Sequence, residues 1–166
     1  KDTETYTFTW GDDAIKVIEK GSDYTDSYTL ILKNGLVQNN ENGNVFTYNS
    51  SNRLIKCTSN DKDETYSAIW DGDKLVSISE YNDEATLTYG TSCKKGYFPL
   101  FATMLTNDGD AALFMAHPEI AGIRSNQLPA SVTWTENGYG GTGSSTSNLT
   151  YEFDKEGYIS KIKTKD

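Results

Sequence analysis

The sequence predicts a mainly β protein: a curved antiparallel meander sheet, half-barrel-like in shape, with a short two-helix insert packed on its concave face. Apolar and polar residues alternate over short runs through most of the 166 residues, which is the period of half-buried strands. Turn-forming Asp, Asn, Gly and Ser separate these runs, so consecutive strands should pair as hairpins. The alternation disappears between about residues 97 and 122. We expect one domain over residues 1–166 with eight to twelve strands joined in sequence order.

The clearest hairpin closes the chain. Tyr151 and Phe153 alternate with polar neighbours, and an Asp-Lys-Glu-Gly turn follows at 154–157. Its glycine can adopt a positive φ angle, and residues 158–162 then return as a second strand.

Looser copies of this hairpin fill the chain from its start. The first places Tyr6, Phe8 and Trp10 on one strand face before a Gly-Asp-Asp turn. A later Asn34-Gly35 pair is a strong signal for a tight hairpin turn. The other predicted turns and loops lie at residues 21–23, 38–44, 49–52, 60–64 and 71–74, and the last strand before the insert contains Ala85, Leu87 and Tyr89.

The insert has helical rather than strand spacing. Apolar residues recur at helical intervals after Pro99, a residue that suits a first helical turn. A polar break at 107–110 separates two short runs, and Pro118 ends the second run. Because two short helices are not stable alone in water, we expect them to bury their apolar side chains in the concavity of the sheet as a plug. Those side chains are Phe98, Leu100, Phe101, Met104, Leu105, Leu113, Phe114 and Met115.

Two segments follow the insert. Residues 126–129 are expected to be a connector, after which Val132 and Trp134 resume the strand alternation. Residues 138–147 are rich in Gly and Ser, and they predict a mobile, protease-sensitive loop before the closing hairpin.

Composition excludes some classes of partner. The net charge of −9 is unfavourable for binding a phosphate backbone, so no nucleic-acid partner is expected. The sequence has no long apolar run that could cross a bilayer.

Cys57 and Cys93 are the only cysteines, and either a bridge or two unpaired thiols fits their spacing. Because the sequence begins at Lys1 without a methionine, we expect that a targeting segment has been removed.

The closing hairpin and the Trp-Asp-Gly-Asp-Lys-Leu-Val segment at 70–76 resemble the tyrosine–aspartate repeats of bacterial Rhs-type shells. The whole chain resembles a family of extracytoplasmic domains of unknown function from gut Bacteroidetes, many of them predicted lipoproteins. The resemblance rests on the hairpin copies, Ala121-Gly122-Ile123, residues 126–129 and residues 151–162. It implies a periplasmic or outer-membrane surface location, with a lipoprotein as precursor, and it carries no catalytic residues over.

Three groups of residues have side chains that could carry out chemistry. His117, the sole histidine, precedes Pro118 without a nucleophile motif nearby, so a capping or surface role is expected. Three aspartate clusters could supply carboxylate ligands for calcium, but aspartate is also common in turns, which explains these clusters equally well. They are Asp12-Asp13, Asp71-Gly72-Asp73 and Asp108-Gly109-Asp110. A glycosidase pair would come from Asp71, Glu136, Glu152 and Asp154. We therefore assign no catalytic residue, no metal ligand and no cofactor, and the ligand-binding residues stay unknown.

These observations favour an envelope binding or interaction module without catalytic activity, which holds a lipid-like or glycan ligand. The alternatives are a glycan-active hydrolase that uses a carboxylate pair, and a structural surface domain that contacts another envelope protein. A ligand site is expected at the boundary between the helices and the sheet, where apolar surface and flexible Met side chains meet.

Overall fold

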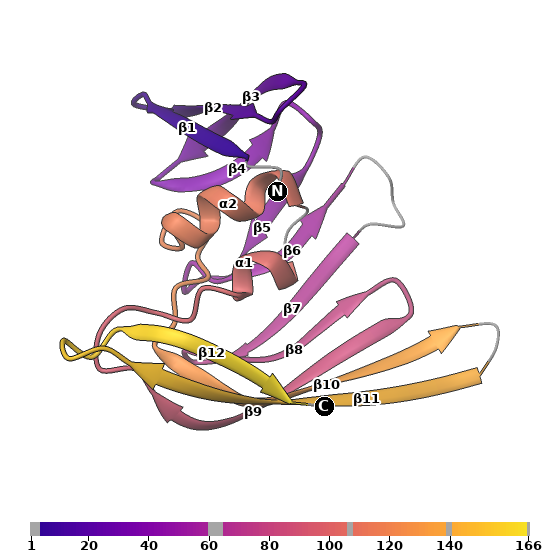
Figure 1. Ribbon diagram of the computed structural model, residues 1–166. Helices are drawn as coiled ribbons and strands as arrows, with labels where there is room; N and C mark the ends of the chain where they lie inside the picture. The colour runs from indigo at the N-terminus through magenta and orange to yellow at the C-terminus, as the bar shows by residue number, and fades with distance from the viewer. Residues whose placement is uncertain (1–3, 60–64, 106–107, 139–140, 166) are drawn as a thin grey trace.

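The computed structural model describes residues 4–59, 65–105, 108–138 and 141–165. Within them, twelve strands form one open sheet in sequence order, and every neighbouring pair is antiparallel. Figure 1 shows the sheet curling around two short helices, so the predicted architecture is confirmed. The strands are β1 Thr5–Trp10, β2 Ala14–Lys20, β3 Thr25–Lys33, β4 Leu36–Asn40, β5 Val45–Tyr48, β6 Leu54–Thr58, β7 Thr65–Asp71, β8 Lys74–Glu80, β9 Asp83–Ser92, β10 Gln127–Gly138, β11 Gly141–Phe153 and β12 Ile159–Lys165.

The hairpin turns explain why the chain forms a meander. Asn34 and Gly35 both adopt positive φ angles, 55° and 76°, as the tight turn between β3 and β4 requires. In the closing hairpin, Asp154 Oδ1 accepts hydrogen bonds from the backbone N–H groups of Glu156 and Tyr158 at 3.0 and 2.9 Å. Gly157 follows with φ 93°. Both predicted turns are confirmed.

The prediction of a mobile loop at 138–147 was wrong for residues 141–147. They form the first half of β11 and pair with β10, for example Trp134 with Ser145 and Val132 with Ser147. Small Gly, Ser and Thr side chains give no apolar alternation, yet main-chain pairing to β10 needs none. Residues 139–140, at the turn itself, lie outside the described residues.

Other boundaries differ by a few residues. β4 continues to Asn40 into the predicted 38–44 loop, and β10 begins at Gln127 inside the predicted connector. Pro129 lies within β10 where the pairing with β9 shifts register on both sides, which is how a strand accommodates a residue without an N–H group. The predicted charged loop at 60–64 falls outside the described residues.

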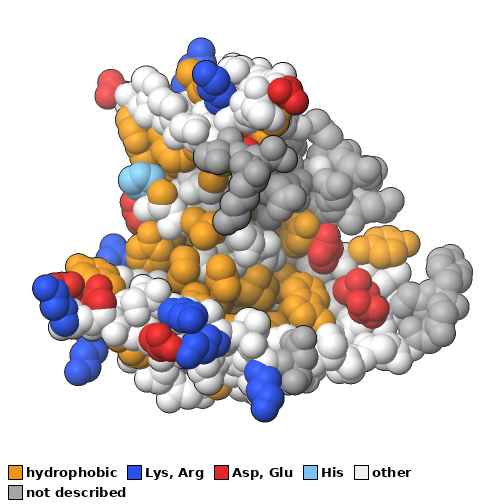
Figure 2. All heavy atoms as spheres, in the orientation of Figure 1, with side chains coloured by type: hydrophobic (Ala, Val, Ile, Leu, Met, Phe, Trp, Pro, Cys, Tyr) orange, Lys and Arg blue, Asp and Glu red, His pale blue; other side chains and the backbone are white. Residues whose placement is uncertain are grey.

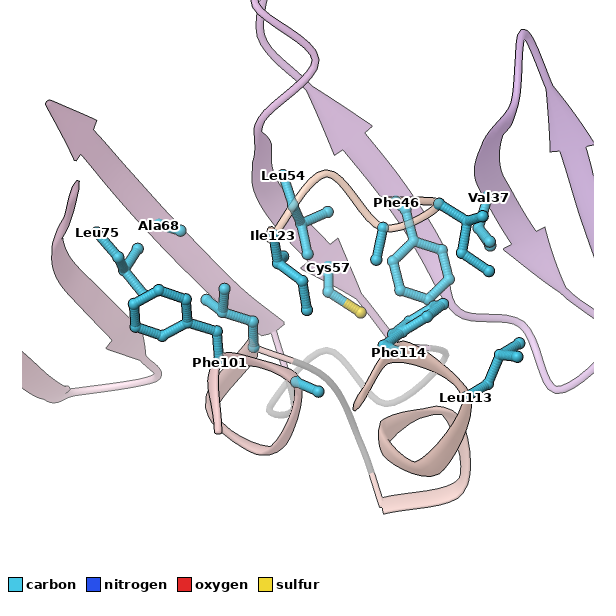
Figure 3. Packing of buried hydrophobic residues seen from close by; sticks show 14 of the residues in the cluster. Val37, Phe46, Leu54, Cys57, Ala68, Leu75, Phe101, Leu113, Phe114 and Ile123 are labelled. Atoms are coloured by element: carbon cyan, nitrogen blue, oxygen red, sulfur yellow. The ribbon is translucent and has the colours of Figure 1, made fainter. Parts of the chain in front are cut away.

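The helices α1 (Phe101–Leu105) and α2 (Asp108–Ala116) lie on the concave side of the sheet. Phe101 and Phe114 are 1% and 0% exposed. Figure 3 shows Phe101 pointing towards Leu75 and Phe114 towards Phe46. The ring centroids of Phe114 and Phe46 are 5.5 Å apart in an edge-to-face arrangement. The insert is therefore the plug that the sequence predicts.

The two cysteines belong to this core and are not bridged. Cys57 and Cys93 are 1% and 3% exposed, and both are free thiols. Burial raises the pKa of Cys57 to about 12 and also raises the pKa of Cys93, so both stay protonated at neutral pH. They serve as small apolar side chains.

One turn carries local backbone strain. Tyr81 opens the two-residue turn between β8 and β9 with φ 52°, and its side chain is 71% exposed. We expect Tyr81→Gly to raise the free energy of unfolding by about 0.5–1 kcal/mol, because the left-handed strain exceeds the extra entropy that glycine gives the unfolded chain. Urea denaturation measures this. Asn82→Gly in the same turn is the control, since Asn82 has no positive φ. A midpoint for Tyr81→Gly no higher than that of the unmodified protein would contradict the expectation.

Candidate functional site

His117 lies just after α2 in a structural role. Its backbone N–H donates to the Leu113 carbonyl at 2.8 Å, and its ring packs edge-on against Trp10 with centroids 4.9 Å apart. Nδ1 lies 3.3 Å from a carboxylate oxygen of Glu119. These partners tie the end of α2 to β1, and they do not form a catalytic triad.

The aspartate clusters are dispersed. Asp12 and Asp13 are exposed in the β1–β2 turn, and Asp73, in the β7–β8 turn, pairs with Arg53. Among the described residues, no three His, Cys, Asp or Glu side chains lie close enough together to hold a metal ion. The side chain of Asp108 is outside the described part of the chain.

Of the carboxylates that a glycosidase pair could use, Glu136 and Glu152 are far apart, and Glu152 and Asp154 are engaged by neighbouring groups. Glu152 pairs with Lys163 on β12, and Asp154 is engaged by the N–H groups of its own turn. Glu136 is opposite Gly143 in the β10–β11 pairing, nine residues along β11 from Glu152. At about 3.3 Å per strand residue this places their backbones roughly 30 Å apart, far beyond a glycosidase spacing. Asp71 ends β7 and is exposed.

The last three strands present a partly exposed apolar surface to the helices, which we call the concave shelf. On β10, Trp134 shares a face with the buried Val132, and Ser145 and Ser147 of β11 lie opposite them. Figure 2 shows hydrophobic side chains gathered in the hollow between the helices and the C-terminal strands. The shelf consists of Trp134, Leu149, Tyr151 and Ile162, all partly buried against the core.

Tyr151 joins the shelf to the helical insert. Tyr151 and Ile162 pair across β11 and β12, so their side chains share one face. The Tyr151 ring lies edge-on to Phe98, with centroids 6.2 Å apart, and Phe98 in turn contacts Phe101 of α1 at 4.8 Å. The shelf therefore borders the helix–sheet boundary at which the sequence predicts a ligand site.

Hydrogen bonding separates the structural aromatic side chains from the available ones. The hydroxyls of Tyr48, Tyr89 and Tyr151 donate to backbone carbonyls of Val37, Leu75 and Pro129, and the Trp70 indole N–H donates to the Leu54 carbonyl at 2.7 Å. Within the described part of the chain, the Trp134 indole N–H has no such partner. Trp134 is thus the shelf residue whose polar edge is free to meet a ligand.

A buried polar cluster also lies under α2. Asp110 is 2% exposed, and its Oδ2 accepts hydrogen bonds from the Asn40 and Asn44 side-chain amides at 2.8 and 3.2 Å. Asn40 Oδ1 accepts from the Asn44 backbone N–H at 2.8 Å, which fixes the orientation of the Asn40 amide. The cluster fastens α2 to β4 and to the turn that follows it. The sequence placed Asp110 in a polar break, and that assignment was wrong.

Burial raises the pKa of Asp110 above its ordinary value, and hydrogen bonds from Asn44, Tyr28 and Asn40 offset this only in part. Each of these partners donates a hydrogen bond to the carboxyl group. Since a metal ion needs acceptor atoms around it, this cluster is a structural anchor rather than a cation site.

No helix in the described residues combines the length and the apolar character needed to cross a membrane. No protein-family model matches the sequence, and no curated protein matches it significantly.

Two solved structures from Bacteroides are similar in fold. A porin-like protein from Bacteroides vulgatus ATCC 8482 superposes with a TM-score of 0.64 and 14% identity, over 96% of this chain and 79% of that chain. A porin-like protein from Bacteroides uniformis ATCC 8492 gives 0.57 and 13%, over 98% of this chain and 82% of the other. At these identities the likeness establishes a shared architecture: the chain has the curved antiparallel sheet of these Bacteroides porin-like proteins.

Proposed function

We propose that this protein is a non-enzymatic binding module of the bacterial cell envelope and that it holds its ligand on the concave shelf. The observation that carries the proposal is Trp134, a partly exposed indole with an unengaged N–H in a curved, helix-bordered surface. Concave surfaces with an aromatic floor and a few polar groups are the usual form of ligand sites.

The chemistry around Trp134 favours a glycan over a fully apolar ligand. Ser145, opposite Trp134, and Ser147, opposite Val132, place small polar side chains beside the indole face. A sugar ring can stack its C–H face on an indole while its hydroxyls bond to serine and to the indole N–H. A lipid-like chain would leave the Trp134 indole N–H and the Ser145 hydroxyl without partners, which is unfavourable.

The envelope location is supported by two lines of observation. The sequence resembles an extracytoplasmic Bacteroidetes family, and the fold resembles porin-like proteins from Bacteroides. Absence of catalysis is part of the same proposal, because Glu136 and Glu152 are far apart and Asp154 is bound by its own turn.

The test compares Trp134→Ala with Trp10→Ala. Trp10 is 47% exposed on β1, at the opposite edge of the sheet from the shelf, so its removal is the control. Because the Trp10 ring also packs against His117 at the end of α2, circular dichroism checks that this variant is folded. Calorimetric titration with neutral oligosaccharides, and separately with a long-chain fatty acid, should show glycan binding weakened about tenfold or more only in Trp134→Ala, the loss of one buried stacking contact.

The outcomes are distinct. Equal glycan affinity in both variants would exclude the concave shelf as the binding site. Fatty-acid binding that requires Trp134 would show that the ligand is not a glycan. Steady hydrolysis of an oligosaccharide, abolished by changing one carboxylate in a folded variant, would replace the binding module by an enzyme.

A further inference from the structure

The chain has two arginines, Arg53 and Arg124, 71 residues apart in sequence, and both line one surface pocket of about 350 Å³. Three segments form the pocket: the β5–β6 turn, the β7–β8 turn, and the stretch between α2 and β10. It shares no lining residue with the concave shelf. Its polar side chains are Ser51, Asn52, Arg53, Asp73, Glu119 and Arg124.

The pocket walls are held in place by hydrogen bonds. Asn49 Oδ1 accepts hydrogen bonds from the backbone N–H groups of Ser51 and Arg53 at 2.9 and 3.0 Å, and these bonds fix the β5–β6 turn. The Ser125 hydroxyl donates to the Asp73 carbonyl at 2.5 Å and joins the other two segments. The pocket is therefore preorganised, which reduces the entropy lost when a ligand binds.

Gly122 allows two of these segments to touch. It has φ 64°, and a Cβ atom at this position would collide with the carbonyl oxygen of Asn52. Only glycine permits so close an approach, so the backbone itself keeps the 117–126 stretch against the β5–β6 turn.

Arg53 is fully engaged by the protein. Its guanidinium bonds to the Asp73 carboxylate and to the Arg124 carbonyl, and it lies over the Trp70 ring at 4.9 Å. With its side chain only 15% exposed, it acts as a brace between the segments.

Arg124 has a different environment. No carboxylate or carbonyl among the described residues accepts a hydrogen bond from its guanidinium, and the residue is exposed. The nearby Glu119 carboxylate lies beside His117. Arg124 is thus the one cation of the pocket that its described neighbours leave unpaired.

We infer that this pocket binds a carboxylate group of a ligand, with the Arg124 guanidinium as its main contact. A guanidinium presents two parallel N–H donors that match the two oxygens of a carboxylate. The rim carries the acidic Asp73 and Glu119, which repel a doubly charged phosphate more strongly than a singly charged carboxylate. The hydroxyl of Ser51 and the amide of Asn52 supply further polar contacts.

The experiment is an NMR titration of backbone amides with sodium glucuronate, with glucose as the uncharged analogue. We expect glucuronate to shift the amides of Ser51, Asn52 and Arg124. Arg124→Gln should weaken this binding by about tenfold or more, the loss of charge-assisted hydrogen bonds. Lys56→Gln removes the same charge from an exposed site on β6 outside the pocket and should leave the affinity unchanged.

Three results would overturn the inference: no saturable shift at these amides, equal shifts with glucose, or equal affinity in Arg124→Gln and Lys56→Gln. Inorganic phosphate provides a further check, because tighter binding of phosphate than of glucuronate would rule out a carboxylate site. Since Arg124 is exposed, its variant should fold, and an unchanged amide spectrum elsewhere verifies that. The outcome is independent of the Trp134 test, which concerns a different surface.

Discussion

Replacing Phe114 by alanine should lower the free energy of unfolding by about 3–5 kcal/mol, and Phe101→Ala should lower it by a similar amount. Both rings are at most 1% exposed, and each joins a helix to the sheet. Phe114 meets Phe46 of β5, and Phe101 meets Trp70 of β7 at a centroid distance of 5.7 Å. Truncating either ring opens a cavity that rigid strands on one side cannot fill.

Urea denaturation followed by circular dichroism measures the change. Phe153→Ala is the matched control, because Phe153 is 43% exposed at the end of β11 and should lose less than about 1 kcal/mol. Unchanged midpoints for both Phe101→Ala and Phe114→Ala would show that the insert is a surface flap. The concave shelf would then have no packed helical border.

The meander was predictable because its information is local. Asn34-Gly35 and the turn at 154–157 specify their geometry within a few residues, and each brings its two strands together. The plug was predictable from a different signal, an apolar segment without strand alternation that needs a partner surface. Each prediction depended on neighbouring residues only.

The first half of β11 could not be predicted in this way. Residues 141–147 carry no apolar period, and their strand state depends on pairing with β10. Gly and Ser-rich sequence is typical of a linker, so the local signal indicated the wrong state. The prediction for Asp110 was wrong for a related reason. The side chains that hydrogen-bond to its buried carboxyl group, Asn40 and Asn44, are about 70 residues earlier in the chain.

The candidate sites show the same limit. The expected position of a ligand site at the helix–sheet boundary followed from the apolar insert, but the role proposed for Trp134 depends on which indole and hydroxyl groups are already bonded. The pocket lined by Arg53 and Arg124 has no sequence motif, because the two residues meet only when three separate segments of the chain fold together. The rarity of arginine in the chain was the one available signal.

The Asp110 cluster predicts a pH-dependent stability. Asp110→Ala should lower the free energy of unfolding by about 3 kcal/mol, since each buried amide donor left without an acceptor costs roughly 1–3 kcal/mol. Asp110→Asn is more informative, because an amide oxygen can still accept from Asn40 and Asn44 while the group stays neutral at every pH.

The sign follows from the direction of the pKa shift. Burial raises the folded-state pKa of Asp110 above its value in the unfolded chain, so between these two values the folded protein binds more protons. Stability from the neutral carboxyl group is fully present below the unfolded pKa, about 3.9, and it decreases as the pH rises to the folded pKa. The groups around Asp110 are Tyr28 on β3, Cys57 on β6, and the two asparagines, and burial keeps both Tyr28 and Cys57 protonated across this range.

Denaturation midpoints of the unmodified protein and of Asp110→Asn, measured at a series of pH values from about pH 4 upwards, test this behaviour across the window between the two pKa values. The stability of Asp110→Asn relative to the unmodified protein should increase with pH over this window and then level off. Glu84→Gln, at an exposed position on β9, should show no such trend. A constant difference between Asp110→Asn and the unmodified protein at all pH values would mean that Asp110 is not buried as a carboxyl group with a raised pKa, and that α2 is anchored chiefly by its apolar side chains.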